Sequence, residues 1–298
     1  MAVYKRSYRP YEGRLTAIWA RPLVITRYGL EQLFQARTTL LMLAASAVWP
    51  MVCAVIIYLN NSVETVPMLN INPRRLMPVN EQFFFVLMNV QGFFAFLLTA
   101  YAGPALVAPD LGNNALPLYL CRPLTRVGYV LGKMAVLAAP LSLITWVPAL
   151  ALWTMQAKMA GATWWSGNLW LPKAIIVGSW VWILFLSLMA LALSAFVRWR
   201  MVASALQFGI FLCAAGFSEA INAVMQTKAG YVINIGHVIG TIWMRLFRAN
   251  TRDTIWRGLF SVSERSMPEW QAWLVLAAVC MVCVLLLEKR LRGREVVS

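Results

Sequence analysis

The sequence predicts an all-α polytopic membrane protein with six transmembrane helices and with both termini in the cytoplasm. Of the 298 residues, 61% are hydrophobic and only 12% are charged, whereas a soluble domain carries about 25% charged residues. The apolar residues also gather in runs that reach the roughly 20 residues a helix needs to cross a bilayer. Charge placement predicts the orientation, because cytoplasmic loops carry an excess of Lys and Arg.

The net charge of the chain is +15. In a membrane protein this first indicates cytoplasmic loops and contact with anionic lipid headgroups, so we expect membrane lipids as partners. Nucleic acid is not expected as a partner, because the sequence contains no basic aromatic module. The five Cys residues are scattered, and no disulfide framework is expected.

Residues 1–37 are basic and are expected to form a cytoplasmic amphipathic segment. Apolar residues recur here at helical spacing, while Arg14, Arg21 and Tyr28 are seven apart and share another face. This pattern predicts a helix at the level of the headgroups that is started or interrupted at Pro22. No apolar run follows a short basic start, so a cleaved signal peptide is not expected.

Six apolar runs are the expected transmembrane helices. They cover about residues 38–59, 83–108, 134–157, 174–197, 201–225 and 270–287, within a transmembrane domain of residues 38–287. The third run contains Pro140 and Pro148, which predict kinks in a membrane helix. In the fourth run Ser187, Ala190 and Ser194 share one face, and such small residues suit close packing between helices.

Residues 109–133 lie between the second and third runs and are too polar to cross a bilayer. We expect Pro109 to end the preceding helix, because its ring removes a donor and restricts the residue before it. Thr125 is expected to cap the next helix. The short apolar piece in between contains Leu116, Leu118, Tyr119 and Leu120. It has two interpretations, a helix that lies on the membrane or a docking element for a soluble partner.

Residues 226–268 are expected to form an external segment. Residues 231–247 are apolar enough to suggest a seventh span, but they contain Asn234, His237 and Arg245. We interpret them as a re-entrant or surface helix pair. With six spans most Lys and Arg lie inside, whereas a seventh span would place the basic tail, residues 288–298, outside.

The sequence contains no signature of an enzyme or of a bound cofactor. The stretch from Gly128 to Lys133 has three residues between its glycines where a phosphate-binding loop has four, and Met134 follows where Ser or Thr is required. His237 is the only His, so no His-based zinc site or catalytic pair is expected. The 11 acidic residues are spread along the chain. We therefore expect no catalytic residues, metal or cofactor in this chain.

A polar stripe is expected near the outer end of the fifth run. Ser218, Glu219, Asn222 and Gln226 are three or four apart and share one helix face. Because a charged group in a membrane helix usually faces the bundle or a water-filled path, we expect the stripe to face the bundle. It lines a substrate route in one interpretation. In the other, it makes an interhelical hydrogen bond or lies near the headgroups.

The residues around the 109–133 loop resemble those of a known family, the permease subunits of ABC exporters of the second type. The resemblance is strongest at Asp110, residues 112–116, residues 120–126 and residues 129–133, which match an acidic residue, a turn, a Pro before a Thr-Arg pair, and a Tyr…Gly-Lys ending. Asn113, Asn114 and Ala115 depart from the Gly-Thr pair that is common at the turn. The predicted architecture is similar to that of the family over nearly the whole chain.

This resemblance implies a mechanism and a set of partners. A separate ATPase subunit would bind ATP and Mg²⁺, and two permeases, as two copies or as paralogues, would work with two ATPases in a bacterial cytoplasmic (inner) membrane. Residues 109–133 would dock on the ATPase and the external hairpin would gate the exit. The residues expected to couple to the ATPase are Asp110, Leu116, Leu118, Tyr119, Arg122 and Arg126.

The apolar spans favour a hydrophobic or amphipathic substrate, which would be exported by alternating access. The alternative is a membrane scaffold or an enzyme-complex subunit that transports nothing. The sequence disfavours an enzyme, because no acids or His cluster at one surface, and it leaves the scaffold open.

Overall fold

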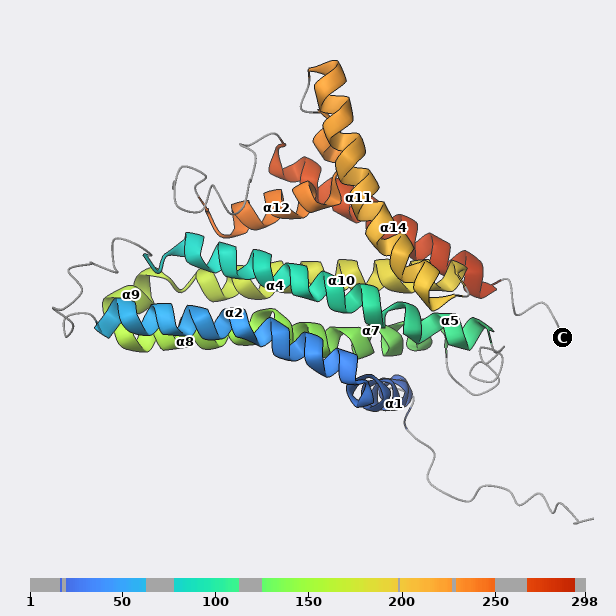
Figure 1. The fold of residues 1–298 in the computed structure, drawn as a ribbon, viewed down its shortest axis with the longest axis horizontal. Helices are drawn as coiled ribbons and strands as arrows, with labels where there is room; N and C mark the ends of the chain where they lie inside the picture. Colours follow the sequence, from blue (N-terminus) through green and yellow to red (C-terminus); the bar gives the residue numbers. More distant parts are fainter. Residues whose placement is uncertain are drawn as a thin grey trace, which may run out of the picture.

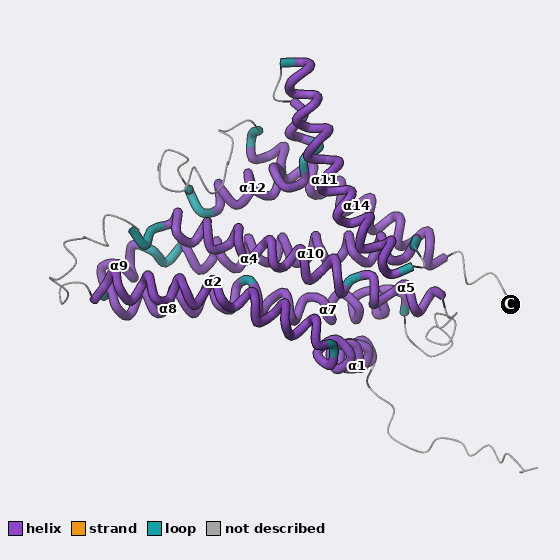
Figure 2. Tube along the Cα trace, viewed as in Figure 1, coloured by secondary structure: helices purple, strands orange, loops and turns teal. Residues whose placement is uncertain are grey.

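The computed structural model describes residues 17, 20–62, 78–112, 125–197, 199–226, 229–249 and 267–292. Within these residues the regular structure is entirely helical and contains no strand (Figures 1 and 2). The elements are α1 (Arg21–Gln35), α2 (Arg37–Ser62), α4 (Glu81–Ala102), α5 (Pro104–Gly112), α7 (Arg126–Ile144), α8 (Trp146–Ala160), α9 (Ala162–Gly167), α10 (Leu171–Phe196), α11 (Arg200–Met225), the 3-10 helix η4 (Ala229–Val232), α12 (Ile235–Leu246) and α14 (Glu269–Arg292).

Six helical stretches of the described chain are long and apolar enough to cross a membrane. They are Arg37–Ser62, Glu81–Ala108, Arg126–Ala160, Leu171–Phe196, Met201–Met225 and Glu269–Arg290. The predicted all-helical class with six candidate spans is therefore confirmed. With its 12 residues, α12 is too short to be one of them.

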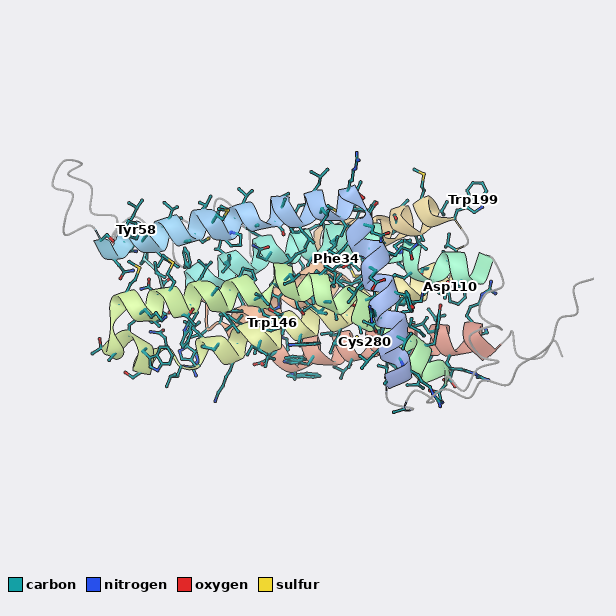
Figure 3. The ribbon with its side chains drawn as sticks, turned by 90° about the horizontal axis from the view of Figure 1, so that it is seen from below. Phe34, Tyr58, Asp110, Trp146, Trp199 and Cys280 are labelled. Atoms are coloured by element: carbon teal, nitrogen blue, oxygen red, sulfur yellow. The ribbon has the colours of Figure 1, made fainter. Side chains whose placement is uncertain are left out.

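Helix α10 lies at the centre of the bundle, where it contacts α4, α5, α7, α8, α11, α12 and α14. The α4–α5 stretch and α10 are the most buried spans, whereas α2, α11 and α14 are mostly exposed. Figure 1 shows α2, α4, α8 and α10 running alongside one another, with α11 inclined away from them. Figure 3 shows α1 crossing over the bundle near the end that carries Asp110.

Two of the candidate spans each consist of two consecutive helices. One breaks at Gly103, where Pro104 follows and cannot donate a backbone hydrogen bond. A Cβ atom on Gly103 would lie 2.5 Å from the Ala190 Cβ, so the glycine allows α10 to approach closely. The other span breaks at Thr145 (φ −94°, ψ −88°), between the two prolines for which kinks are predicted.

The prediction that Pro109 ends the helix before the loop is wrong. Helix α5 continues through Pro109 to Gly112. Because α5 packs along α10 and buries Leu106, Val107 and Ala108, this burial offsets the one backbone hydrogen bond that the proline removes. The predicted cap on the other side is confirmed, since the Thr125 hydroxyl accepts a hydrogen bond from the Gly128 N–H at 3.1 Å.

Candidate functional site

Asp110 and Lys133 form a buried ion pair between the last turn of α5 and the first turns of α7. Lys133 Nζ lies 2.8 Å from Asp110 Oδ2, and the two side chains are only 11% and 16% exposed. The Tyr129 hydroxyl donates a hydrogen bond to the same carboxylate oxygen at 2.7 Å. The Lys133 ammonium also lies 5.7 Å from the centre of the Tyr129 ring. We call these three residues the α5–α7 clamp.

Local sequence explains why the clamp forms. Thr125 starts α7 at a fixed residue, and Tyr129 and Lys133 then follow at spacings of four, which place them on one face of the helix. Taking two charges out of water is costly, and the mutual attraction offsets this cost only when further hydrogen bonds satisfy the remaining lone pairs. The Tyr129 hydroxyl supplies such a bond to Asp110.

The clamp holds together the two helices that flank residues 113–124. One of the two, α7, also carries α1 on a neighbouring face. Thr26 Oγ1 lies 3.1 Å from both the Pro22 and the Gly132 carbonyl oxygens, and its proton can be shared between them. The backbones approach closely, because a Cβ atom on Gly132 would lie 3.0 Å from the Pro22 oxygen.

Gly29 of α1 makes a second close contact between α1 and α7. A Cβ atom on Gly29 would lie 2.6 Å from Val136 Cγ2, closer than carbon atoms can approach without displacement. Helix α1, the start of α7 and the end of α5 are thus joined by polar bonds and by glycine contacts at one end of the bundle. The three helices are in direct contact there, through Thr26 and Gly132 and through Asp110, Tyr129 and Lys133.

The structure describes only part of the predicted coupling set. Asp110 is half-buried and points into the clamp, and Arg126 is half-buried in the first turn of α7. Leu116, Leu118, Tyr119 and Arg122 lie outside the described residues. Tyr129 and Lys133 were not predicted as site residues, since a pair that closes across a loop leaves no periodic signal. The available hints were their spacing of four on the same helix and the Tyr…Gly-Lys ending at residues 129–133, to which no site role was assigned.

The predicted polar stripe on α11 does not form one surface. Ser218 is buried, Asn222 is half-buried, and Glu219 and Gln226 are exposed, so the expectation that Glu219 faces the bundle is wrong. Asn222 Oδ1 accepts a hydrogen bond from the Gly230 N–H at 2.8 Å. Gln226 ends α11 in the left-handed conformation (φ 48°). A substrate route along these residues stays a prediction.

His237 lies in the first turn of α12, beside the end of α11. Its ring stacks on Tyr231 of η4 at 4.3 Å between ring centres. Burial lowers the pKa of His237, and the nearby negative charge of Glu219 acts in the opposite direction without reversing the shift. This pKa favours a neutral imidazole in the packed junction of α11, η4 and α12.

Among the described residues no group of three or more His, Cys, Asp or Glu side chains could hold a metal ion. No protein-family model matches the chain, and no curated protein matches it in sequence.

Proposed function

We propose that the chain is the membrane-spanning permease subunit of an ATP-driven transporter of the kind formed by ABC exporters of the second type. Both termini would lie in the cytoplasm of a bacterial cell, and the spans would cross its cytoplasmic membrane. ATP and Mg²⁺ would bind to a separate ATPase subunit. A second permease, as another copy or a paralogue, would complete the membrane part.

One observation carries the proposal. The two helices that flank residues 113–124 are held together by the buried pair of Asp110 and Lys133, and α1 packs on one of these helices at the same end. A subunit that is moved by a soluble motor needs a stiff connection at the surface where the motor binds. The clamp and α1 supply such a connection to the segment in which the sequence predicts docking.

The other end of the chain supports the proposal in a second way. Helix α12 follows α11 and precedes α14, and it packs on α4, α10 and α14. A short helix packed in this place fits the external re-entrant hairpin expected before the last span, and backbone that enters a membrane without spanning it is tolerated where protein covers it.

The substrate would be hydrophobic or amphipathic. The candidate spans are apolar, and charged side chains in a membrane usually mark a polar route. The buried charged pair at Asp110 and Lys133 lies at one end of the bundle, in the clamp, rather than along a central path. Alternating access would then move the substrate along apolar helix surfaces.

Purification of the intact complex tests this proposal. The chain, carrying an affinity tag, is expressed with the genes beside its own and isolated from membranes in a mild detergent. We expect stoichiometric recovery of a subunit with a phosphate-binding loop, and ATP hydrolysis that depends on both subunits. Recovery of the chain with only non-ATPase partners would favour the scaffold instead. Mass spectrometry of bound lipids and small molecules then narrows the substrate class.

A further inference from the structure

Trp243 of α12 inserts between α4 and α10 at two glycines. The side chain is only 3% exposed, and its indole N–H donates a hydrogen bond to the Gly178 carbonyl oxygen at 3.0 Å. A Cβ atom on Gly92 would lie 2.5 Å from the tip of the Trp243 ring, at Cη2. A Cβ atom on Gly178 would lie 3.3 Å from the Trp243 nitrogen. The two glycines thus form the slot that holds this indole.

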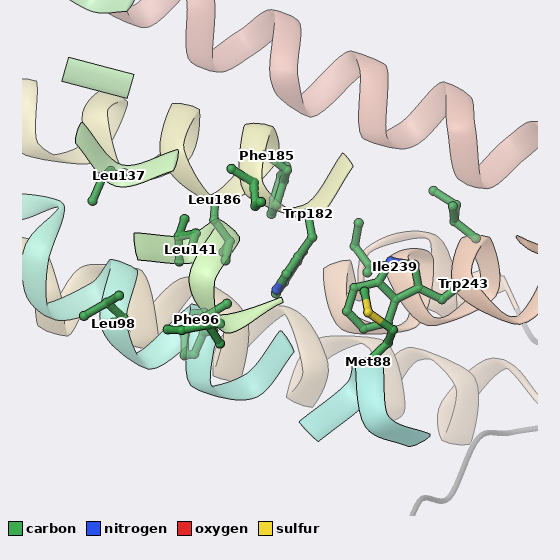
Figure 4. Close-up of a cluster of buried hydrophobic side chains, with 14 of the residues drawn as sticks. Met88, Phe96, Leu98, Leu137, Leu141, Trp182, Phe185, Leu186, Ile239 and Trp243 are labelled. Atoms are coloured by element: carbon green, nitrogen blue, oxygen red, sulfur yellow. The ribbon is translucent and has the colours of Figure 1, made fainter. Parts of the chain in front are cut away.

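A second tryptophan completes the junction of the three helices. The Trp182 indole N–H on α10 donates to the Gly92 carbonyl oxygen on α4 at 3.0 Å. The rings of Trp182 and Trp243 meet edge to face, with their centres 5.9 Å apart, a geometry that aromatic pairs prefer. Figure 4 shows Trp182 and Trp243 side by side, with Met88 and Ile239 beside Trp243.

We expect the packing of Trp243 between Gly92 and Gly178 to fix both the position and the helical conformation of α12. An isolated helix of 12 residues is marginal in water, because nucleation is costly and few bonds follow. The contacts at its far end are aromatic, with Phe247 at 6.5 Å from Phe85 and the Arg248 guanidinium at 4.7 Å from the Trp170 ring centre. The hydrogen bond from Trp243 to Gly178 is a polar anchor of α12 on α10.

We propose that α12 is a strap, by which we mean a short helix that covers the contact between α4 and α10 (the seam) and can detach from it. The Trp243 side chain is the pin, because its insertion into the glycine slot holds the strap in place. Beneath the strap the seam contains Ser179, which is fully buried and donates to Met88 Sδ at 3.6 Å. Withdrawing one indole from the slot removes the hydrogen bond, the edge-to-face pair and the glycine contacts together. In the proposed transporter the strap would close this seam, but the pin itself is a property of the chain alone.

Hydrogen–deuterium exchange of the full-length protein in nanodiscs, without any ATPase, tests the pin. Trp243→Ala should raise amide exchange across residues 235–246 by about tenfold or more, because local opening requires fewer contacts to break. Exchange in α7 should not change. Gly92→Ala keeps the indole but adds a methyl where its tip lies, so it should unseat α12 as well.

Glycine-to-alanine variants at different distances from Trp243 should raise the amide exchange of α12 by different amounts. Gly178→Ala meets Trp243 at a looser distance than Gly92→Ala, so its effect should be smaller, and Gly216→Ala, which meets nothing within 4 Å, should have none. Trp180→Ala on α10, whose side chain is 40% exposed, controls for loss of a tryptophan.

The proposal is overturned if α12 exchanges at the parental rate in Trp243→Ala while the protein elutes and protects α10 normally. If that variant fails to insert, Gly92→Ala decides in the same way, since its exchange must exceed that of Gly216→Ala. Failure of the strap leaves the ATPase assignment intact, because no ATPase enters the measurement.

Discussion

At the residue scale, two ion pairs of similar length show how exposure to solvent decides how much an ion pair contributes to stability. Arg27 and Glu31 lie 3.1 Å apart on α1, with side chains 80% and 50% exposed, so water screens them and the pair contributes about 1 kcal/mol at most. Asp110 and Lys133 are similarly close but buried. Removing one partner of a buried pair leaves an uncompensated charge and costs about 3–5 kcal/mol.

We therefore predict that Asp110→Asn and Lys133→Met each destabilise the protein by about 3–5 kcal/mol, whereas the double variant loses clearly less than the sum. The reason is that the double variant buries no unpaired charge. Reversible unfolding in SDS measures the free energies. Glu31→Gln is the control and should change stability by under about 1 kcal/mol. Additive losses in the double variant would show that the two side chains act independently.

The protonation of His237 can be followed by NMR without assigning resonances to residues, because it is the only His in the chain. Its pKa in the folded protein is lowered, mainly by burial. A lowered pKa means that the folded state favours the neutral ring. The stability that this gives is complete above the ordinary histidine pKa, about 6.5, and is lost as the pH falls through the lowered value.

We predict that the ¹³Cε1 resonance of His237, in protein purified without a histidine tag, titrates below the ordinary histidine value. Glu219→Gln should move the midpoint further down, because the charge of Glu219 raises this pKa. A Glu288→Gln variant, in the last turns of α14 (Glu269–Arg292), should leave the midpoint in place. A midpoint above the ordinary value, or one indifferent to Glu219, would contradict the packing of this junction.

Sequence reasoning at this scale succeeded where the rule is local. The Thr125 cap is confirmed because a cap depends on residues three apart. It failed for Glu219, which is exposed, because a helical face shows which residues align but not which side meets a neighbour. The α5–α7 clamp could not be predicted from spacing, because its residues lie on two different helices. Which helices pack together depends on the tertiary fold and not on spacing within either helix.

At the element scale, glycines decide which helices can meet. Gly29 and Gly132 let α1 lie on α7, and Gly103 lets the α4–α5 bend lie on α10. Small residues have this role in membranes because no hydrophobic force drives apolar helices together in lipid, so close contact supplies the attraction. The sequence shows the glycines but not their partners, because each partner comes from a distant helix.

We predict that Gly29→Val undocks α1 from α7, since even a Cβ atom at this position would lie 2.6 Å from Val136 Cγ2. Amide exchange across residues 21–35 should rise by about tenfold, with α10 unchanged. Gly209→Val makes the same substitution in α11, where a Cβ atom meets nothing within 4 Å, and should have no effect on α1. Normal protection of α1 in Gly29→Val would disprove the docking.

Proline is the clearest case of an element rule overruled by packing. Pro109 was expected to end a helix and does not, because α5 buries its apolar residues along α10. Pro140 and Pro148 were expected to kink the third span, and the break lies between them at Thr145. The local rule thus predicts distortion well, but tertiary contacts decide where a helix ends.

At the scale of the whole molecule, composition and run length predicted the class and the number of candidate spans, because both follow from the need to satisfy backbone groups in lipid. They did not predict that α10 would be central or that α11 would incline away from the bundle (Figure 1). Those arrangements depend on contacts between helices, for which a single sequence gives no direct signal.

The orientation of the chain gives a further prediction. In a variant without native Cys, Ser261→Cys should react with an impermeant thiol reagent in intact cells, because residues 226–268 are expected outside. Ser166→Cys in the exposed turn of α9 should react as well. Trp199→Cys, at a side chain 75% exposed between α10 and α11, should react only after lysis. Labelling of Ser261→Cys only after lysis would contradict the six-span topology.

The central claim is that residues 113–124, which connect α5 to α7 in the sequence, dock on a soluble ATPase. Leu118→Asp tests it most directly. Burying one such side chain contributes about 1.5–3 kcal/mol, and the introduced carboxylate adds a desolvation cost, so the affinity for the ATPase should fall by about tenfold or more. Leu169→Asp is the control, at a side chain 50% exposed outside this segment.

The measurement is the amount of ATPase that co-purifies with each variant from membranes containing equal amounts of the chain. We predict normal insertion for both variants, full recovery of the ATPase with Leu169→Asp, and its loss with Leu118→Asp. Equal recovery of the ATPase with the two variants would contradict the docking of this segment and, with it, the assignment of the chain as a permease driven through residues 113–124.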